Sequence, residues 1–340
     1  MINSRRRSRI SPSGCDNIDH ADNQVRLDTA VLFLVFNRPG PTERVFAAIR
    51  QARPQRLYVA ADGARSDRDG EAEKVLRVRE IVSRVDWPCD VMTLFRESNL
   101  GCKAAVSGAI SWFFQHEEQG IILEDDCLPH PDFFTYCDAL LDRYAEDERV
   151  WVVTGDNFQQ GNQRGDGSYY FSIFNHVWGW ATWRRAWARC DLAMSYWPRW
   201  QKSDAWRQLL PDKVMRVYWA LIFDKMYRNE IDTWDYPWTA GVWFHGGLTA
   251  TPNVNLVSNI GFGEDATHTT SDTSDTAALK TQPIGELTHP SSVAQDVEAD
   301  RFVFQSVYGG QDMKFFRLLL TRLAGKLQSR AASFGRPKGG

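Results

Sequence analysis

The sequence predicts an α/β fold whose mixed, mostly parallel sheet is covered by helices on both faces. Short apolar runs alternate with helix-like segments through the first 125 residues. The apolar runs lack polar alternation, as expected for strands that are buried on both faces. A polar residue or turn closes each run. This regular alternation is typical of βαβ units, which build a parallel sheet.

The elements are expected in a fixed order along the chain. The first strand, 31–36, ends at the turn 37–41, and Thr42 is expected to cap a helix over 42–53. Strands at 57–61, 91–95 and 120–123 alternate with helices at 69–85 and from 99–103 through Phe114. Pro129 and Pro131 should end the fourth strand, with Asp132 capping a helix that begins at Phe133.

The second half of the chain has a different character. Most of the 14 tryptophans of the whole chain lie between Trp151 and Trp243, among irregular segments. A helix is expected at 211–229 and a strand at 243–249. We expect a disordered basic tail over 1–27 and one domain over 28–305, divided near residue 135. An amphipathic basic helix and tail should follow over 306–340.

Composition removes several classes of function. The net charge of −3 offers no general attraction to nucleic acid. No apolar stretch reaches the length of a membrane span. Six irregularly spaced cysteines form neither a disulfide framework nor a zinc pattern, which favours a reduced, cytoplasmic protein. The C-terminal helix should either dock on its own domain or lie on an anionic membrane surface, as a peripheral contact at the inner face of the plasma membrane.

Three consecutive carboxylates follow the fourth strand and mark a candidate site. Glu124, Asp125 and Asp126 come directly after the buried run 121–123, where unpaired charge is costly. Carboxylate oxygens suit Mn²⁺ or Mg²⁺, although an exposed acidic turn would also explain the triplet. Arg38 and Asp62 follow earlier strands, so they should meet the triplet at the carboxyl edge of the sheet, where α/β proteins bind ligands.

Several short motifs resemble one family. They are Phe-Asn-Arg-Pro (36–39), Ala-Asp-Gly (61–63), Asn-Leu-Gly (99–101), Ile-Ile-Leu-Glu-Asp-Asp (121–126), Trp-Gly-Trp-Ala-Thr-Trp (178–183) and Asn-Leu-Val-Ser-Asn-Ile-Gly (255–261). Over about residues 30–300 the chain is similar to nucleotide-diphospho-sugar transferases of the GT-A fold. It resembles bacterial glycosyltransferase-like proteins of polysaccharide loci and, distantly, the enzyme that begins N-glycan branching with N-acetylglucosamine.

The resemblance implies a nucleotide-binding part over about 28–135, an acceptor part over about 136–305, and roles for individual residues. Asp126 would bind Mn²⁺ or Mg²⁺, and His268 would complete the metal shell. Asp62 would accept a hydrogen bond from the base, unless it is a helix or turn cap. The remaining donor-binding residues would be Arg38, Asn99, Gly101, Lys103, Glu124, Asp125, Trp178 and Trp180. A surface salt bridge is the alternative for Arg38, and an ordinary helical position for Lys103.

Glycosyl transfer also needs a base to deprotonate the acceptor hydroxyl. Asp235, between Trp234 and Tyr236, is the candidate, and it implies direct displacement with inversion; Asp156 is the second choice. The expected function is metal-dependent transfer of a sugar from a nucleotide-diphospho-sugar to a glycan or lipid-linked acceptor, in surface polysaccharide biosynthesis. A sugar nucleotidyltransferase and a non-catalytic glycan-binding module of the same fold are the alternatives.

Overall fold

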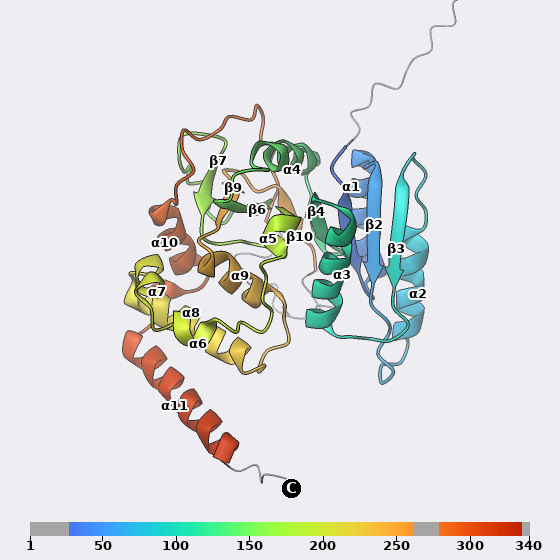
Figure 1. The fold of residues 1–340 in the computed structure, drawn as a ribbon. Coiled ribbons are helices and arrows are strands. Elements are labelled where there is room, and N and C mark those ends of the chain that lie inside the picture. The colour runs from blue at the N-terminus through green and yellow to red at the C-terminus, as the bar shows by residue number, and fades with distance from the viewer. Residues whose placement is uncertain (1–26, 262–278, 335–340) are drawn as a thin grey trace, which may run out of the picture.

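The computed structural model describes residues 27–261 and 279–334, and a single mixed sheet of eight strands organises them (Figure 1). Its strand order is β3-β2-β1-β4-β8-β6-β9-β7. Four of the seven neighbouring pairs run parallel, including all three pairs among the first four strands. The strands are β1 (Val31–Val35), β2 (Arg56–Ala61), β3 (Asp90–Phe95), β4 (Gln119–Glu124), β6 (Val150–Thr154), β7 (Tyr169–Ser172), β8 (Trp180–Trp183) and β9 (Leu248–Pro252). The predicted fold class is confirmed.

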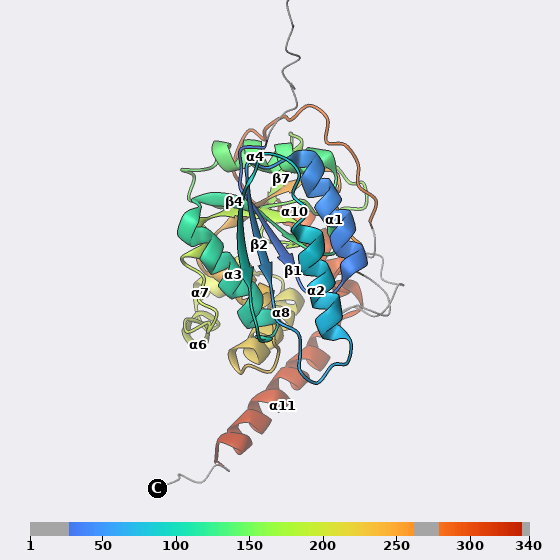
Figure 2. The same ribbon diagram turned by 90° about the vertical axis from the view of Figure 1, so that its right-hand side faces the viewer.

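Helices cover both faces of this sheet, as Figures 1 and 2 show for its parallel half. The helices α1 (Pro39–Ala52), α2 (Glu71–Val82) and α4 (Pro131–Arg143) lie on one face, and α3 (Cys102–His116) lies on the other. Alternate strand residues supply two cores. Val31 and Phe33 pack beneath α1, whereas Leu32 and Leu34 pack beneath α3.

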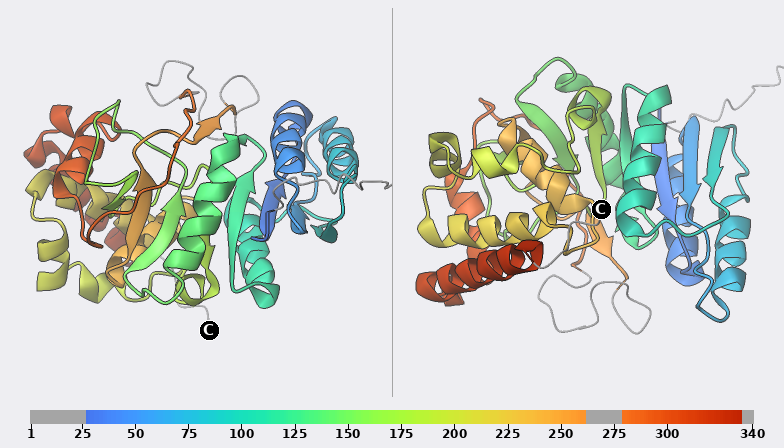
Figure 3. Two further views of the ribbon diagram at one scale, coloured as in Figure 1. Left: turned by 90° about the horizontal axis from the view of Figure 1, so that it is seen from above. Right: turned by 60° about the horizontal axis from the view of Figure 1, so that its bottom comes forward.

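The second half of the chain adds a helical layer around a tryptophan-rich core (Figure 3). Its helices are α5 (Arg184–Trp187), α6 (Trp197–Trp200), α7 (Asp204–Leu209), α8 (Lys213–Tyr227), α9 (Asp235–Phe244), α10 (Val297–Ser306), the 3₁₀ helix η1 (Gly310–Asp312) and α11 (Phe315–Phe334). The helix predicted at 211–229 is α8. The strand predicted at 243–249 is wrong, because α9 continues to Phe244 and β9 begins only at Leu248.

Two predicted helix caps are also wrong. Helix α1 begins at Pro39, because a proline suits the first turn, and Thr42 lies inside the helix. Helix α4 begins at Pro131, and its N-cap is His130, whose Nδ1 accepts a hydrogen bond from the Asp132 amide. The tail expected over 1–27 lies outside the described residues, apart from Leu27. No disulfide joins any of the five described cysteines, and no helix within 27–261 or 279–334 is long and apolar enough to span a bilayer.

A separate two-stranded sheet lies directly after the end of β4. The strand β5 (Cys127–Pro129) pairs antiparallel with β10 (Val257–Asn259). The sequence predicts only the end of the fourth strand at this place. Pro129 is compatible with this pairing because it lies at the end of a two-stranded ribbon. The pairing brings the segment that follows β10 against the acidic triplet.

Asp300 of α10 makes the stability of this region pH-dependent. Its side chain is 3% exposed and accepts hydrogen bonds from Ser172 Oγ at 2.5 Å and Gln295 Nε2 at 2.8 Å. Burial raises the pKa of Asp300 to about 6, and these hydrogen bonds only partly oppose the effect. Because the folded pKa lies above the ordinary value, the contribution to stability is greatest at low pH and falls as the pH rises from about 4 to about 6.

We therefore expect Asp300→Asn to remove one component of the pH dependence of unfolding. Between about pH 4 and pH 6, the free energy of unfolding of the wild type should fall by on the order of 2–3 kcal/mol more than that of the variant. Urea unfolding followed by tryptophan fluorescence at several pH values measures this difference. If the free energy of unfolding changed equally with pH in the two proteins between about pH 4 and pH 6, the assignment of this pH dependence to Asp300 would be wrong. A constant difference in stability between the two proteins would not affect this test.

Candidate active site

A pocket of about 720 Å³ opens at the carboxyl edge of the parallel strands. It is lined by residues that follow β1, β2, β3 and β4 and by the segment that leads into α9. Nine residues predicted for the site line it together: Arg38, Asp62, Asn99, Gly101, Glu124, Asp125, Asp126, Trp178 and Asp235. The sheet topology explains this convergence, since parallel strands end at the same edge.

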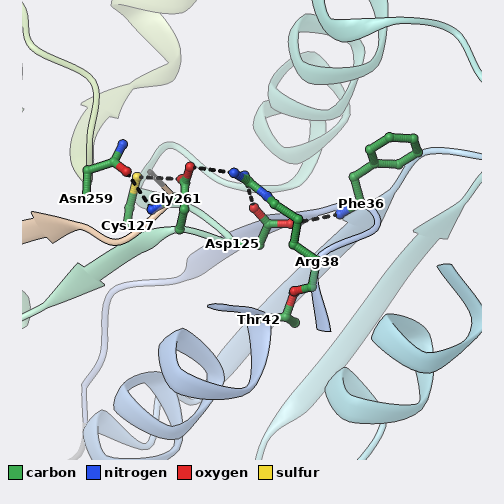
Figure 4. Close-up of polar contacts among 8 residues, drawn as sticks. Phe36, Arg38, Thr42, Asp125, Cys127, Asn259 and Gly261 are labelled. Atoms are coloured by element: carbon green, nitrogen blue, oxygen red, sulfur yellow. Dashed lines mark hydrogen bonds and ion pairs between the residues drawn. The ribbon is translucent and has the colours of Figure 1, made fainter. Parts of the chain in front are cut away.

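Arg38 neutralises part of the acidic triplet (Figure 4). Its Nη1 donates to Asp126 Oδ2 at 2.9 Å, and its Nη2 is paired with Asp125 Oδ1. The Phe36 amide donates to the other oxygen of Asp125 at 3.2 Å. Burial on its own would lower the pKa of Arg38, but the charges and hydrogen bonds of the two aspartates outweigh burial and raise it. Arg38 is therefore a fixed positive charge at the end of β1.

The triplet also holds carboxyl groups that are easily protonated. Burial raises the pKa of Glu124 to about 8, and the charges of Asp126, Asp125 and Asp235 contribute to the rise. Burial likewise raises the pKa of Asp125 to about 6, against the opposing effect of Arg38. Glu124 and Asp235 thus lie close enough to interact electrostatically, although more than 100 residues separate them in the chain.

The donor set suits a divalent cation that shares its shell with a substrate. Mg²⁺ is usually held by one or two carboxylates together with substrate phosphates, and Asp126 with Asp125 could supply those carboxylates. No group of three or more His, Cys, Asp or Glu side chains in the described part of the chain could hold a metal ion. His268, predicted as a further ligand, lies outside the described residues. A cation on Asp126 would have to displace Arg38 Nη1 from that carboxylate.

Asp62 and Asn99 shape the loop at the far side of the pocket. Both carboxylate oxygens of Asp62 accept from the Leu100 amide, at 3.1 and 3.0 Å, and Oδ1 also accepts from the Gly63 amide. Asn99 Nδ2 donates to the Gly63 carbonyl at 2.8 Å. Gly101 is the N-cap of α3 and has a φ of +80°, which favours glycine. These contacts place the loop, and the base contact expected of Asp62 stays a prediction.

Asp235 faces the triplet from the start of α9. Its Oδ1 accepts from the Tyr236 amide at 2.9 Å and is also paired with Thr233 Oγ1. Both of these contacts go to the same oxygen, which fixes the orientation of the carboxylate. Neighbouring residues of this segment, Asp232 and Tyr236, line the pocket as well. A positioned carboxylate that lines a pocket could take a proton from a bound hydroxyl.

The two tryptophans of the Trp-Gly-Trp element have different environments. Trp178 lines the pocket, and its amide donates to Asp156 Oδ2 at 3.0 Å. Trp180 is 0% exposed and stacks on Trp234 with ring centroids 5.6 Å apart. The prediction that Trp180 walls the sugar site is therefore wrong. Gly179, with a φ of +79°, turns the chain between the two rings.

Two other predicted residues lie outside the pocket lining. Lys103 is on the first turn of α3 but is not among the residues that line the pocket, so its expected phosphate contact is not supported. Asp156 is 1% exposed and lies behind Trp178, which removes it as an alternative base. Burial raises its pKa well above the ordinary value. Its role is to hold the backbone of Trp178.

Sequence reasoning missed several lining residues. Arg65 and Arg96 contribute guanidinium groups, Asp232 a further carboxylate and Asn259 an amide. Asp232 could have been suspected, because it lies three residues before Asp235 in the same segment. Asn259 belongs to the motif at 255–261, but only the β5–β10 pairing shows that it reaches the pocket.

Comparison with known proteins gives weak likenesses. No family model and no curated protein sequence matches the chain. Among solved structures, HddC from Yersinia pseudotuberculosis is 10% identical with a TM-score of 0.29, over 46% of this chain and 78% of that one. A UDP-glucose pyrophosphorylase complexed with UDP-glucose is 11% identical with a TM-score of 0.27, over 47% and 78% of the two chains. The inositol-1-phosphate CTP transferase from T. maritima is 10% identical with a TM-score of 0.28, over 48% of this chain and 73% of that one.

These likenesses do not establish a family for the chain. Two of these three proteins are by name a UDP-glucose pyrophosphorylase and a CTP transferase, and neither name denotes a glycosyltransferase. The expected likeness to the enzyme that begins N-glycan branching is not supported. The TM-scores are too low for the activity of any of these proteins to be carried over. The function must be argued from the pocket itself.

Proposed function

We propose that this protein is an enzyme that transfers a sugar from a nucleoside-diphosphate sugar to a hydroxyl acceptor. The observation that carries the proposal is the meeting of Asp235 and the acidic triplet across one pocket. The triplet and Arg38 offer a place for a diphosphate and its cation at the carboxyl edge of the sheet. Asp235 offers a base on the opposite side, where an acceptor could enter.

The charge of the pocket supports glycosyl transfer over nucleotidyl transfer. Among the described lining residues, six are acidic and three are arginines: Asp62, Glu124, Asp125, Asp126, Asp232 and Asp235 against Arg38, Arg65 and Arg96. With Glu124 protonated, because its pKa is about 8, five carboxylates still face the three guanidinium groups. Two of the arginines are already ion-paired, Arg38 with the triplet and Arg65 with Glu71. A nucleoside triphosphate and a sugar phosphate would together bring more negative charge here than one diphosphate sugar and a neutral hydroxyl. An acidic pocket disfavours the former pair.

Each group has a definite task in the proposed reaction. Asp235 takes the proton of the acceptor hydroxyl as that oxygen forms a bond to the anomeric carbon. The bond from the anomeric carbon to the diphosphate oxygen breaks, and the electron pair leaves with the nucleoside diphosphate. A divalent cation on Asp126 would stabilise the negative charge of that leaving group. Arg38 lies beside the same charge, and a single displacement inverts the anomeric configuration.

Sugar nucleotidyl transfer is the second candidate. The names of the similar solved structures fit this reaction better than the first, but their TM-scores of 0.27–0.28 decide nothing between the two. The two reactions release different products. Incubation with a nucleoside triphosphate and a sugar phosphate releases pyrophosphate only if the second candidate is right. A non-catalytic glycan-binding module would give neither product.

A thermal-shift titration tests the donor site directly. UDP, GDP, TDP and CMP are added to the wild type and to Asp126→Asn, each with and without Mn²⁺. We expect one nucleotide to raise the melting temperature in the presence of Mn²⁺, by an amount equivalent to about 2–3 kcal/mol at a concentration near 100 times its Kd. We expect the variant to lose this stabilisation, because Asp126 is the proposed cation ligand. Stabilisation that is equal in both proteins would contradict the assignment of Asp126.

A further inference from the structure

The strand β3 forms one edge of the eight-stranded sheet, and among the described residues it pairs with β2 alone (Figure 1). The amides of Asp90, at its start, and of Arg96, directly after it, donate to backbone carbonyls on the β2 side. Because the direction of bonding alternates along a strand, the N–H and C=O groups of Val91, Thr93 and Phe95 point away from β2. These backbone groups are available to another strand.

The edge lacks the features that commonly keep edge strands from pairing with other chains. β3 contains no proline and no lysine, and its register with β2 has no bulge. Its apolar side chains reach solvent instead: Val91 is 42% exposed, and Met92 and Phe95 are each 37% exposed. An apolar edge strand with open hydrogen-bonding groups is a template for a further strand.

The apolar surface of this edge continues onto α2. Leu76 is 59% exposed and lies three residues before Arg79, on the same side of the helix. The Arg79 guanidinium lies over the Phe95 ring, 5.1 Å from its centroid. Leu76 is therefore on the side of α2 that faces the edge strand. Figure 2 looks toward this edge, with α3 on one side of it and α2 on the other.

The sequence of β3 is complementary to a second copy of itself in the antiparallel direction. When Thr93 faces Thr93 of the second copy, the outward backbone groups of the two strands bond one another and the other positions meet suitable partners. The cross-strand pairs are Val91 with Phe95, Met92 with Leu94, and Asp90 with Arg96. Such apolar and opposite-charge pairs stabilise antiparallel sheets. A shift of the register by one step in either direction breaks the pair of opposite charges.

We propose that two copies of this chain associate through β3, antiparallel about Thr93, into one continuous sheet. The two-fold axis is perpendicular to the sheet, so the α2 helices of both copies lie on the same face and Leu76 of each lies beside the junction. The pairing of Asp90 with Arg96 selects a second copy over an unrelated strand. Arg96 also lines the pocket, so the dimer brings Asp90 of the second copy to the pocket wall. The proposal stands whichever reaction the pocket performs.

Sedimentation velocity of the full-length protein tests the proposal. Thr93→Pro is the first variant, because the Thr93 amide points away from β2 and its loss leaves the parent sheet intact. Thr93→Ala keeps this amide and is the matched control. Asp90→Arg places like charges opposite each other in both symmetry-related pairs. Asp90→Arg combined with Arg96→Asp exchanges the two charges and makes each pair complementary again.

We expect the wild type and Thr93→Ala to sediment as dimers of the 340-residue chain, and Thr93→Pro as a monomer. Asp90→Arg should raise the dissociation constant of the dimer by about tenfold or more, and the exchange of charges should restore it. A monomeric wild type would overturn the proposal, and so would a folded Thr93→Pro variant that still dimerises. Failure of the exchange to restore association would overturn the register about Thr93. A thermal melt confirms that each variant is folded, and Asp90→Arg decides the outcome if Thr93→Pro is not.

Discussion

Replacement of Asp235 by asparagine is expected to lower the turnover number of glycosyl transfer by about 10²–10⁴-fold, with little change in nucleotide affinity. The substitution keeps the shape of the side chain and an oxygen that can accept from Thr233 and the Tyr236 amide. It removes only the ability to take a proton. The effect should therefore appear in kcat rather than in the binding of the nucleoside diphosphate, which we propose to bind at the acidic triplet on the other side of the pocket.

Asp232→Asn is the matched control for this experiment. Asp232 lies in the same segment and lines the same pocket, but it is the more exposed of the two carboxylates. We expect its substitution to change KM for the acceptor more than kcat. Release of the nucleoside diphosphate in a coupled assay gives both constants, and the melting temperature with nucleotide confirms binding. An Asp235→Asn variant that turned over at the wild-type rate would remove Asp235 as the base.

The parallel half of the fold follows from the sequence for a simple physical reason. Strands buried on both faces read as uninterrupted apolar runs, so 31–36, 57–61 and 120–123 are conspicuous. Because these strands are parallel, the polar residues that follow them must meet at one edge. Arg38, Asp62 and Asp126 could therefore be assigned to a common site before their positions were known.

The second half of the chain is less predictable because its contacts are not local. Trp178 and Trp180 look equivalent in the sequence, yet the turn at Gly179 sends one to the pocket and the other to the core. Tryptophan-rich segments carry no clear period, so the sequence predicts irregular structure and a strand from residue 243, where helix α9 instead continues to Phe244. Asn259 reaches the site only through the pairing of β10 with β5, which sequence spacing does not reveal.

The pairing of β10 with β5 places Gly261, two residues after β10, against Asp126 and Arg38. We expect Gly261→Ala to disrupt the proposed donor site. A Cβ at this position would lie 2.1 Å from Asp126 Oδ2 and 2.8 Å from Arg38 Nη1. Both separations are shorter than a Cβ tolerates, and the Asp126 Cβ at 2.7 Å is too close as well, so the Asp126 side chain or the Gly261 backbone must shift and the contact with Arg38 is disturbed. We expect a loss of about 1–3 kcal/mol in the free energy of unfolding, as for other overpacked positions. Nucleotide affinity measured by calorimetry should fall by about tenfold or more.

Gly40→Ala is the control for the change of glycine to alanine. Gly40 lies two residues after Arg38 in the first turn of α1, and a Cβ there would meet nothing within 4 Å. It should leave nucleotide affinity unchanged and alter stability by no more than about 1 kcal/mol, because the entropic gain of alanine over glycine is opposed by the contact of its Cβ with the ring of Pro41. If both substitutions weakened binding equally, the steric explanation would fail.

A double-mutant cycle then identifies the atoms responsible for the loss of stability caused by Gly261→Ala. In an Asp126→Ala background the carboxylate oxygen that meets the new Cβ is absent, although the Asp126 Cβ remains 2.7 Å from the added carbon. The loss of stability caused by Gly261→Ala should therefore be smaller in that background than in the wild type, with a coupling energy on the order of 1 kcal/mol. An equal loss in both backgrounds would show that the strain falls on another neighbour. The segment after β10 would then have no direct influence on the carboxylate of Asp126.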